Sequence, residues 1–302
     1  MKGKERMIQS AEDKNIAMEV SKISVAVNLV LSLFKLVAGV VAHSGAMISD
    51  AVHSASDVFS TFIVMIGVTM ANKKSDKEHP YGHERMECVA SIILAVVLAA
   101  TGIGIGVEGI QKIAGGEFKT MEIPGMLALA AAVISIVTKE WMYWYTRAAA
   151  KKINSGALMA DAWHHRSDAL SSIGAFAGIL GARLGFPVLD PAASVVICIF
   201  IEKAALDVFK DAMDKMVDKA CDDQTIQRMR NVVLSREGVK EIDNMKTRMF
   251  GAKVYVDIEI AADENITLIE AHKIAENVHG AIEKEFTEVK HCMVHVNPYG
   301  AG

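Results

Sequence analysis

Two short stretches of sequence decide the fold, and each repeats the other. Residues 50–57 read DAVHSASD and residues 161–168 read DAWHHRSD, so five of the eight positions are identical. On an α-helix, the first, fourth and eighth residues of such a stretch share one face. Each copy therefore predicts a helix that carries a stripe of acid, imidazole and acid along one side.

Both stripes lie within long apolar stretches. Six such stretches are each long enough to cross a bilayer, which takes about 20 helical residues; they are residues 17–41, 45–71, 87–113, 122–146, 156–181 and 186–207. An ionisable side chain at the bilayer centre costs at least about 2.5 kcal/mol, so the stripes must face a partner helix, a water-filled cavity or a bound ion. For a single histidine in a span, the alternative is a structural role in which it is hydrogen-bonded. The same stripe occurs twice in this chain, which argues against a purely structural role.

The composition fits a membrane part joined to a soluble part. Hydrophobic residues make up 52% of the 302 residues and charged residues 23%, with a mean hydropathy of +0.28. The net charge of −4 excludes the basic field that a nucleic-acid partner needs. The four cysteines form no CxxC pair, which argues against a disulfide scaffold and against a thiolate zinc knuckle.

Basic residues predict the orientation of the spans. They gather before the first span, between the second and third, and between the fourth and fifth, whereas the opposite loops hold few. Cytoplasmic loops carry the excess of lysine and arginine, so we expect a multi-pass protein of the cell membrane with both termini cytoplasmic.

The pattern changes after about residue 208. A helix is predicted over 222–235, strands over 240–249 and 252–261, a helix from the capping box at Thr267 to about 287, and a strand over 289–297. The order α-β-β-α-β predicts a small ferredoxin-like α+β domain. We therefore expect a transmembrane domain of six helices over 1–208 and a cytoplasmic domain over 209–302.

The second and fifth spans run in opposite directions, which sets the pairing of their stripes. Asp57 can then face His164 while His53 faces Asp168. Four nitrogen and oxygen donors at this spacing suit a tetrahedral divalent ion, with zinc the natural candidate, and cobalt, iron and manganese remain open.

The first acid of each stripe, Asp50 or Asp161, has two possible roles. The antiparallel arrangement places Asp50 toward the outside and Asp161 toward the cytoplasm. They are either relay acids at the two mouths of the site or partners that orient the ligand histidines.

A second cluster of metal-binding residue types lies between the second and third spans. The sequence SDKEHPYGHER brings Asp76, Glu78, His79 and His83 together in a loop that contains proline and glycine. Such a loop is a candidate metal site, although loop histidines are usually only solvated. The tail histidines 272, 279, 291 and 295 are by default surface residues.

At these residues the chain resembles the cation diffusion facilitator family over nearly its whole length. The likeness rests on six spans, the paired stripes, the HPYGHERME loop at 79–87 and the ferredoxin-like tail. It implies a homodimer that exports divalent metals from the cytoplasm in exchange for protons. It implies a transport site formed by His53, Asp57, His164 and Asp168, and a membrane-surface site formed by Asp76, His79 and His83.

The resemblance also assigns roles to several further positions, and at some of them this chain has other residue types than the family pattern. The His-x-x-x-Asp form of the second span favours zinc. In the tail, Asp243 and Glu259 stand where the best-known bacterial zinc exporter has histidines, and Asn297 replaces an acid. The candidate cytoplasmic metal site is therefore a weaker or differently selective one, made of Asp243, Glu259, His272 and His295. Arg85 and Asp218 match an interfacial charge interlock of the dimer.

Two other classes of protein are weighed against a transporter. A membrane metalloenzyme needs a motif such as HExxH and an open metal position, and the sequence has no such motif. A metal sensor without transport has no need of acids in the spans. We expect no enzyme and no organic cofactor, with zinc as cargo and manganese, iron, cobalt or cadmium as alternatives. The physiological metal, the proton stoichiometry and the occupancy of the cytoplasmic site stay open.

Overall fold

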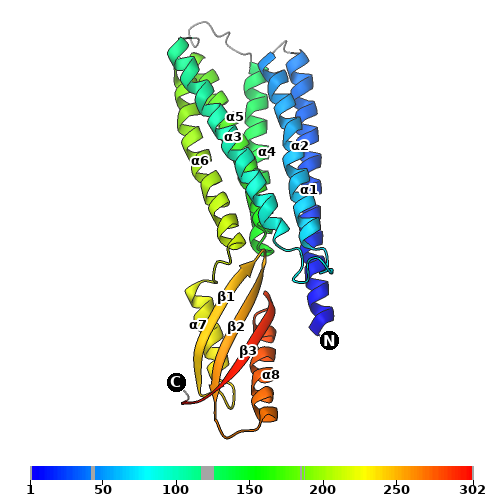
Figure 1. Ribbon diagram of the computed structural model, residues 1–302. Helices are drawn as coiled ribbons and strands as arrows, with labels where there is room; N and C mark the ends of the chain where they lie inside the picture. The colour runs from blue at the N-terminus through cyan, green and yellow to red at the C-terminus, as the bar shows by residue number, and fades with distance from the viewer. Residues whose placement is uncertain (1, 42–44, 117–125, 184–185, 187, 301–302) are drawn as a thin grey trace. The chain divides into compact units, whose positions relative to one another are not determined.

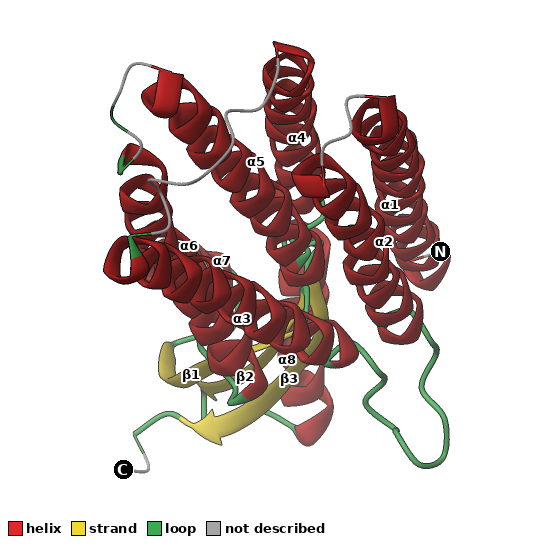
Figure 2. Ribbon diagram, turned by 90° about the horizontal axis from the view of Figure 1, so that it is seen from above, coloured by secondary structure: helices red, strands yellow, loops and turns green. Residues whose placement is uncertain are grey.

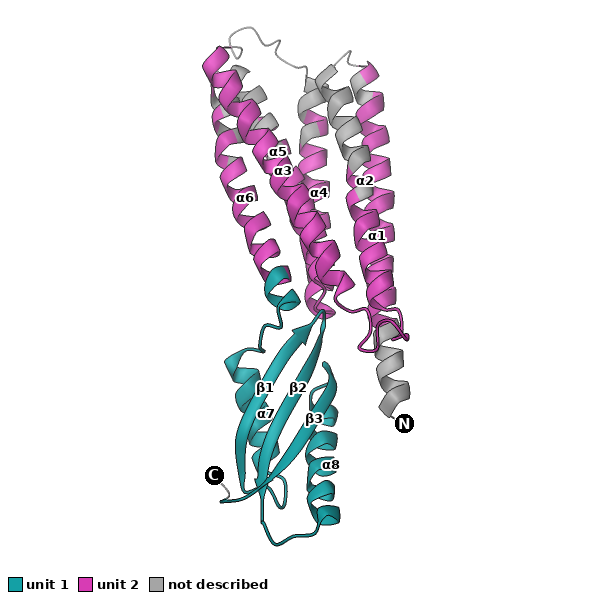
Figure 3. Ribbon diagram, viewed as in Figure 1, with its two compact units in different colours: residues 1–6, 213–302 teal, residues 7–212 magenta. Residues whose placement is uncertain are grey.

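A computed structural model describes residues 2–300 apart from 42–44, 117–125, 184–185 and 187 (Figure 1). The chain divides into two compact units (Figure 3): residues 7–212 form one, and residues 1–6 with 213–302 form the other. The first unit is helical, and the second contains the only sheet in the described part of the chain.

Long helices build the first unit. In the described residues they are α1 Lys2–Val41, α2 Gly45–Ala71, α3 Met86–Gly115, α4 Met126–Lys152, α5 Gly156–Arg183 and α6 Leu189–Met216. The predicted apolar stretches fall within these helices or within a few residues of their ends. The main difference is α1, which begins at Lys2 because its polar first residues are mostly good helix formers such as lysine, arginine, glutamate and glutamine.

Helix α5 is the centre of this unit. It contacts α2, α3 and α4 (Figure 2), and its small residues Ala157 and Ala160 are buried in the shared apolar cluster. Small residues also set the neighbouring α2–α3 contact, where a side chain at Gly67 would overlap the methyl group of Ala90. Close approach of this kind is typical of helices that associate in membranes.

A short turn fixes the register of α4 against α5. Asn154 takes a left-handed conformation with φ of 53° after the end of α4, and Ser155 Oγ accepts a hydrogen bond from the Leu158 amide at 3.2 Å to begin α5. Lys139 lies about 13 residues before the end of α4 and Asp168 about 12 after the start of α5, so both are about 20 Å from the turn. The turn therefore brings these two residues to the same depth.

Helix α1 shows the polarity of a membrane bundle. It exposes apolar residues such as Val30 and Leu33, and it buries the polar side chains of Ser24, Asn28 and Lys35. In the described residues, Glu12–Val37 and Met86–Gly115 are long and apolar enough to cross a membrane by length and composition. The stripes of α2 and α5 lower the hydropathy of those helices, and the full count of six spans stays a prediction.

The second unit confirms the predicted α-β-β-α-β order. Its elements are α7 Asp223–Leu234, β1 Glu241–Phe250, β2 Lys253–Ala262, α8 Leu268–Glu285 and β3 Val289–Pro298. Strand β2 is central, antiparallel to β1 and parallel to β3. The apolar core joins the sheet to both helices through residues such as Met229, Ile258 and Ile282. The capping box of Thr267 and Glu270 opens α8 as the sequence predicts.

Candidate metal centre

Three of the predicted ligands meet inside the helical unit. Asp57 comes from α2, and His164 and Asp168 come from successive turns of α5. One ligand atom from each lies within 4.8 Å of the others, and all three side chains are buried. Two carboxylates and an imidazole form a donor set that suits a divalent transition metal.

The pairing across the two helices agrees with their antiparallel directions. His164 Nε2 lies 3.4 Å from Asp57 Oδ1 and 4.0 Å from Asp168 Oδ2. The side chains of Asp50 and His53 lie outside the described residues, so the fourth ligand, His53, stays a prediction.

The cluster also contains a buried lysine that the sequence motifs do not predict. Lys139 Nζ on α4 donates to Asp57 Oδ2 at 2.6 Å, to Asp168 Oδ2 at 2.8 Å and to Asn28 Oδ1 of α1 at 2.9 Å. Its side chain is 1% exposed. The signal was present in the sequence, since a lysine within the predicted span 122–146 has to face the bundle interior and a partner.

A second polar group lies one helical turn before the cluster on α5. Asp161 is fully buried, accepts a hydrogen bond from Thr61 Oγ1 at 3.4 Å and lies 3.5 Å from His165 Nε2. His165 in turn lies 3.4 Å from Ser24 Oγ. Asp161 therefore contacts Thr61 and His165, which is the histidine next to the predicted ligand His164.

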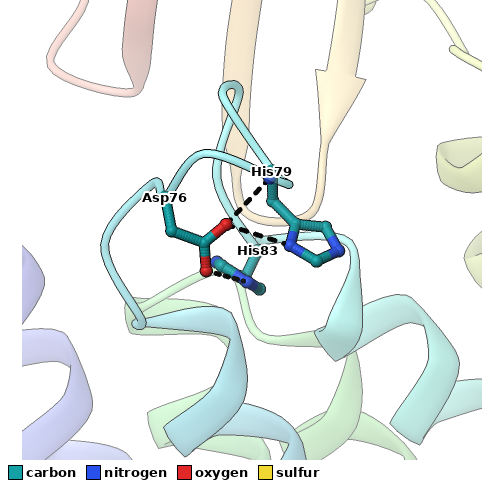
Figure 4. Close-up of side chains that lie close together, drawn as sticks. All are labelled: Asp76, His79 and His83. Carbon is teal, nitrogen blue, oxygen red and sulfur yellow. Dashed lines mark hydrogen bonds and ion pairs between the residues drawn. The ribbon is translucent and has the colours of Figure 1, made fainter.

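The loop between α2 and α3 brings Asp76, His79 and His83 together (Figure 4). Asp76 Oδ1 lies 3.2 Å from His79 Nδ1, Asp76 Oδ2 lies 3.5 Å from His83 Nε2, and the two rings are 4.5 Å apart. His83 is buried, whereas Asp76 and His79 are exposed. The three donors are already in place for a surface metal ion.

Hydrogen bonds keep the loop carboxylate charged. Lys73 donates to Asp76 Oδ2 at 2.9 Å, and the His79 amide donates to Asp76 Oδ1 at 2.8 Å. These bonds hold the pKa of Asp76 well below its usual range. Because a depressed pKa keeps the carboxylate ionised above its own value, Asp76 is available as an anionic ligand throughout the neutral and mildly acidic range.

The four candidate ligands of the second unit are not gathered in this way. Asp243 accepts a hydrogen bond from Asn297 at 2.8 Å, and Glu259 accepts one from Asn244 at 3.1 Å. His295 is the register neighbour of Glu259 on the adjacent strand, whereas His272 is exposed on α8. Among the described residues of one chain, these four do not form a cluster of three or more converging ligands.

The buried cysteine of this unit is not a thiolate. Cys292 on β3 is fully buried, and its burial, with Glu283 and Asp257 nearby, raises the pKa of its thiol to about 12. A thiol that stays protonated at neutral pH is a poor metal ligand.

The predicted interlock residues lie in different units. Arg85 directly precedes α3 in the helical unit, and Asp218 follows α6 in the second unit. Asp218 takes a left-handed conformation with φ of 63°, which is uncommon for a residue other than glycine.

Both units match known protein families. Residues 21–217 match the family model described as cation efflux transmembrane domain, and residues 221–299 match the one described as cation efflux protein, cytoplasmic domain. Among relatives, the manganese efflux system protein MneP of Bacillus subtilis (strain 168) is 31% identical over 96% of this chain and 99% of its own length. Metal tolerance protein C1 of Arabidopsis thaliana is 33% identical over 93% of this chain, which spans 62% of that protein.

Solved structures cover about a quarter of the chain. The C-terminal domain of MamM in a nickel form is 19% identical with a TM-score of 0.25, covering 26% of this chain and 98% of that one. The two family matches cover nearly all of the sequence from residue 21 to residue 299. The chain thus belongs to the cation diffusion facilitator family, whose members are membrane transporters of metal cations and not enzymes.

Proposed function

We propose that this chain exports divalent metal ions from the cytoplasm in exchange for protons, with Asp57, His164, Asp168 and His53 as the transport site. The observation that carries the proposal is the buried cluster of two carboxylates and an imidazole on α2 and α5. Buried acids and imidazole inside a membrane bundle are costly, so they mark the path of an ion that neutralises them. Membership of a family of metal transporters supports the same reading.

Zinc is the first candidate for the cargo. Imidazole nitrogen and carboxylate oxygen together are typical zinc ligands, and His53 would complete a tetrahedral set. Manganese is the second candidate because the relative named as a manganese efflux system is similar over 96% of this chain. Manganese prefers oxygen donors, which agrees with the two carboxylates of the cluster.

Proton exchange follows from competition for the same lone pairs. Imidazole and carboxylate must be deprotonated to bind a metal, so metal uptake releases protons and proton uptake releases the metal. Two packings of the helices, one open to each side and each favoured by a different occupant, are enough to turn this competition into transport.

The proposed setting is a homodimer in the cell membrane with both termini in the cytoplasm. The basic residues near the start of α1, between α2 and α3 and at the end of α4 support this orientation. In this proposal Arg85 and Asp218 belong to a charge interlock of the dimer near the membrane surface. The match to a cytoplasmic domain of cation efflux proteins supports pairing of two chains through the second unit.

Transport by the purified chain in liposomes tests the proposal. One set of vesicles contains a metal-sensitive dye and another a pH-sensitive dye, and zinc, manganese, iron, cobalt and cadmium are added in turn. We expect zinc or manganese to enter with matched movement of protons in the opposite direction, and no flux in empty vesicles. Metal flux without proton movement contradicts the exchange, and no flux of any of the five metals contradicts the function.

The loop cluster of Asp76, His79 and His83 is proposed as a second, surface metal site. Asp76→Ala is expected to remove one zinc site per chain while the transport cluster still binds, since Asp76 contacts both histidines. Titration calorimetry with zinc measures the number of sites. Glu78→Ala is the matched control, because Glu78 is an exposed acid of the same loop outside the cluster. An unchanged number of zinc sites in Asp76→Ala contradicts the assignment.

A further inference from the structure

The Lys139 side chain fills the position between the two carboxylates of the metal cluster. Its ammonium has three N–H donors, and each has an acceptor: Asp57 at 2.6 Å, Asp168 at 2.8 Å and Asn28 at 2.9 Å. A side chain that is 1% exposed and hydrogen-bonded on every donor is held in a built cation site. The three acceptors come from three helices, α2, α5 and α1, and the lysine comes from a fourth.

The ammonium and a metal ion would be held by the same two carboxylates. A divalent metal held by Asp57 and Asp168 would lie about 2.0–2.2 Å from one oxygen of each carboxylate. Lys139 Nζ already bridges one oxygen of each at 2.6 and 2.8 Å. Two positive centres bridging the same pair of carboxylates would repel each other strongly in a buried, poorly screened site.

We propose that Lys139 is a tethered cation that takes the place of the metal in the empty transport site and is displaced when the metal binds. This inference rests on the proposed function and adds to its transport site a residue that competes with the metal. The charges favour exchange over sharing, because two carboxylates are neutralised by one dication without the ammonium. With the ammonium retained, the filled site would carry an extra positive charge.

Two consequences follow for the transport cycle. Metal binding must break the three hydrogen bonds of Lys139, so the lysine weakens the affinity of the site for its cargo. After the metal leaves, Lys139 returns to the carboxylates, so the empty carrier does not expose two unpaired buried acids. Removal of the Lys139 ammonium should therefore tighten metal binding and slow the return of the empty carrier.

The test measures zinc and manganese binding and transport for the full-length Lys139→Gln variant. We expect the dissociation constant for the ion to fall at least tenfold, and both the half-saturating concentration and the maximal rate of transport to fall. A merely structural role for Lys139 would lower the rate without tightening binding. Lys203→Gln is the matched control, since Lys203 is an exposed lysine of α6, and its dissociation constant should equal that of the wild type.

Asn28→Leu keeps the test decisive if Lys139→Gln does not fold. It removes one acceptor of the ammonium, leaves both carboxylates in place and should lower the dissociation constant twofold to fivefold. If the wild-type chain binds the metal and the folded variants show an unchanged or higher dissociation constant, the role of Lys139 is overturned and the proposed function stands. Failure of the wild-type chain to bind or transport zinc or manganese overturns the proposed function, and the tethered cation with it.

Discussion

Asp57→Asn is expected to reduce zinc or manganese flux about 100-fold or more, because it removes a charged ligand at the centre of the proposed transport site. Asparagine has nearly the same shape as aspartate, so packing of α2 against α5 should survive. The remaining carboxylate, Asp168, is then neutralised by Lys139 at 2.8 Å, and the cluster has no net negative charge to attract a dication. Flux into dye-loaded vesicles measures the effect.

The control for Asp57→Asn makes the same chemical change elsewhere. Asp207 is an exposed acid of α6, and Asp207→Asn should transport at the wild-type rate. Both variants need the same elution volume in size-exclusion chromatography, which shows that the lost flux is not lost folding. Wild-type flux in folded Asp57→Asn would show that this carboxylate is not part of the transport site.

The stripes of α2 and α5 could be predicted because their information is local. The spacing of acid, histidine and acid specifies a helix face, and the number of preceding spans specifies opposite directions for the two helices. Together they predict that Asp57 faces His164, and the structure places these side chains 3.4 Å apart. The same local logic predicted every element of the second unit.

The lysine of the cluster was missed because its meaning depends on a distant partner. Hydropathy averaged over a span hides one lysine, and the sequence alone does not say that the turn after α4 brings Lys139 level with Asp168. The position of His165 was missed for the same reason. Adjacent histidines on one helix point in different directions, so the partner of His165 differs from that of His164. His165 lies one turn after Asp161 on the same helix, 3.5 Å away, whereas its contact with Ser24 of α1 is visible only in the tertiary structure.

The double variant Asp57→Asn, Asp168→Asn is expected to be strongly destabilised. It removes both charged partners of Lys139 and leaves a buried ammonium with only neutral acceptors. Removing the partner of a buried charge typically costs about 3–5 kcal/mol. For a unit of this size, such a loss lowers the melting temperature by about 10 °C. Thermal unfolding in detergent, followed by intrinsic fluorescence, measures the shift.

Adding Lys139→Met to the double variant should restore most of the lost melting temperature. Methionine is unbranched, uncharged and close to the lysine stem in volume, so the triple variant replaces an unpaired charge with an apolar side chain. Lys203→Met in the same double-variant background is the control and should restore nothing, because Lys203 is exposed on α6. If Lys139→Met restores no more than Lys203→Met, the two carboxylates are not the groups that neutralise the buried lysine. Restoration specific to residue 139 would mean that the three charges form one energetic unit, as exchange between a tethered ammonium and a dication requires.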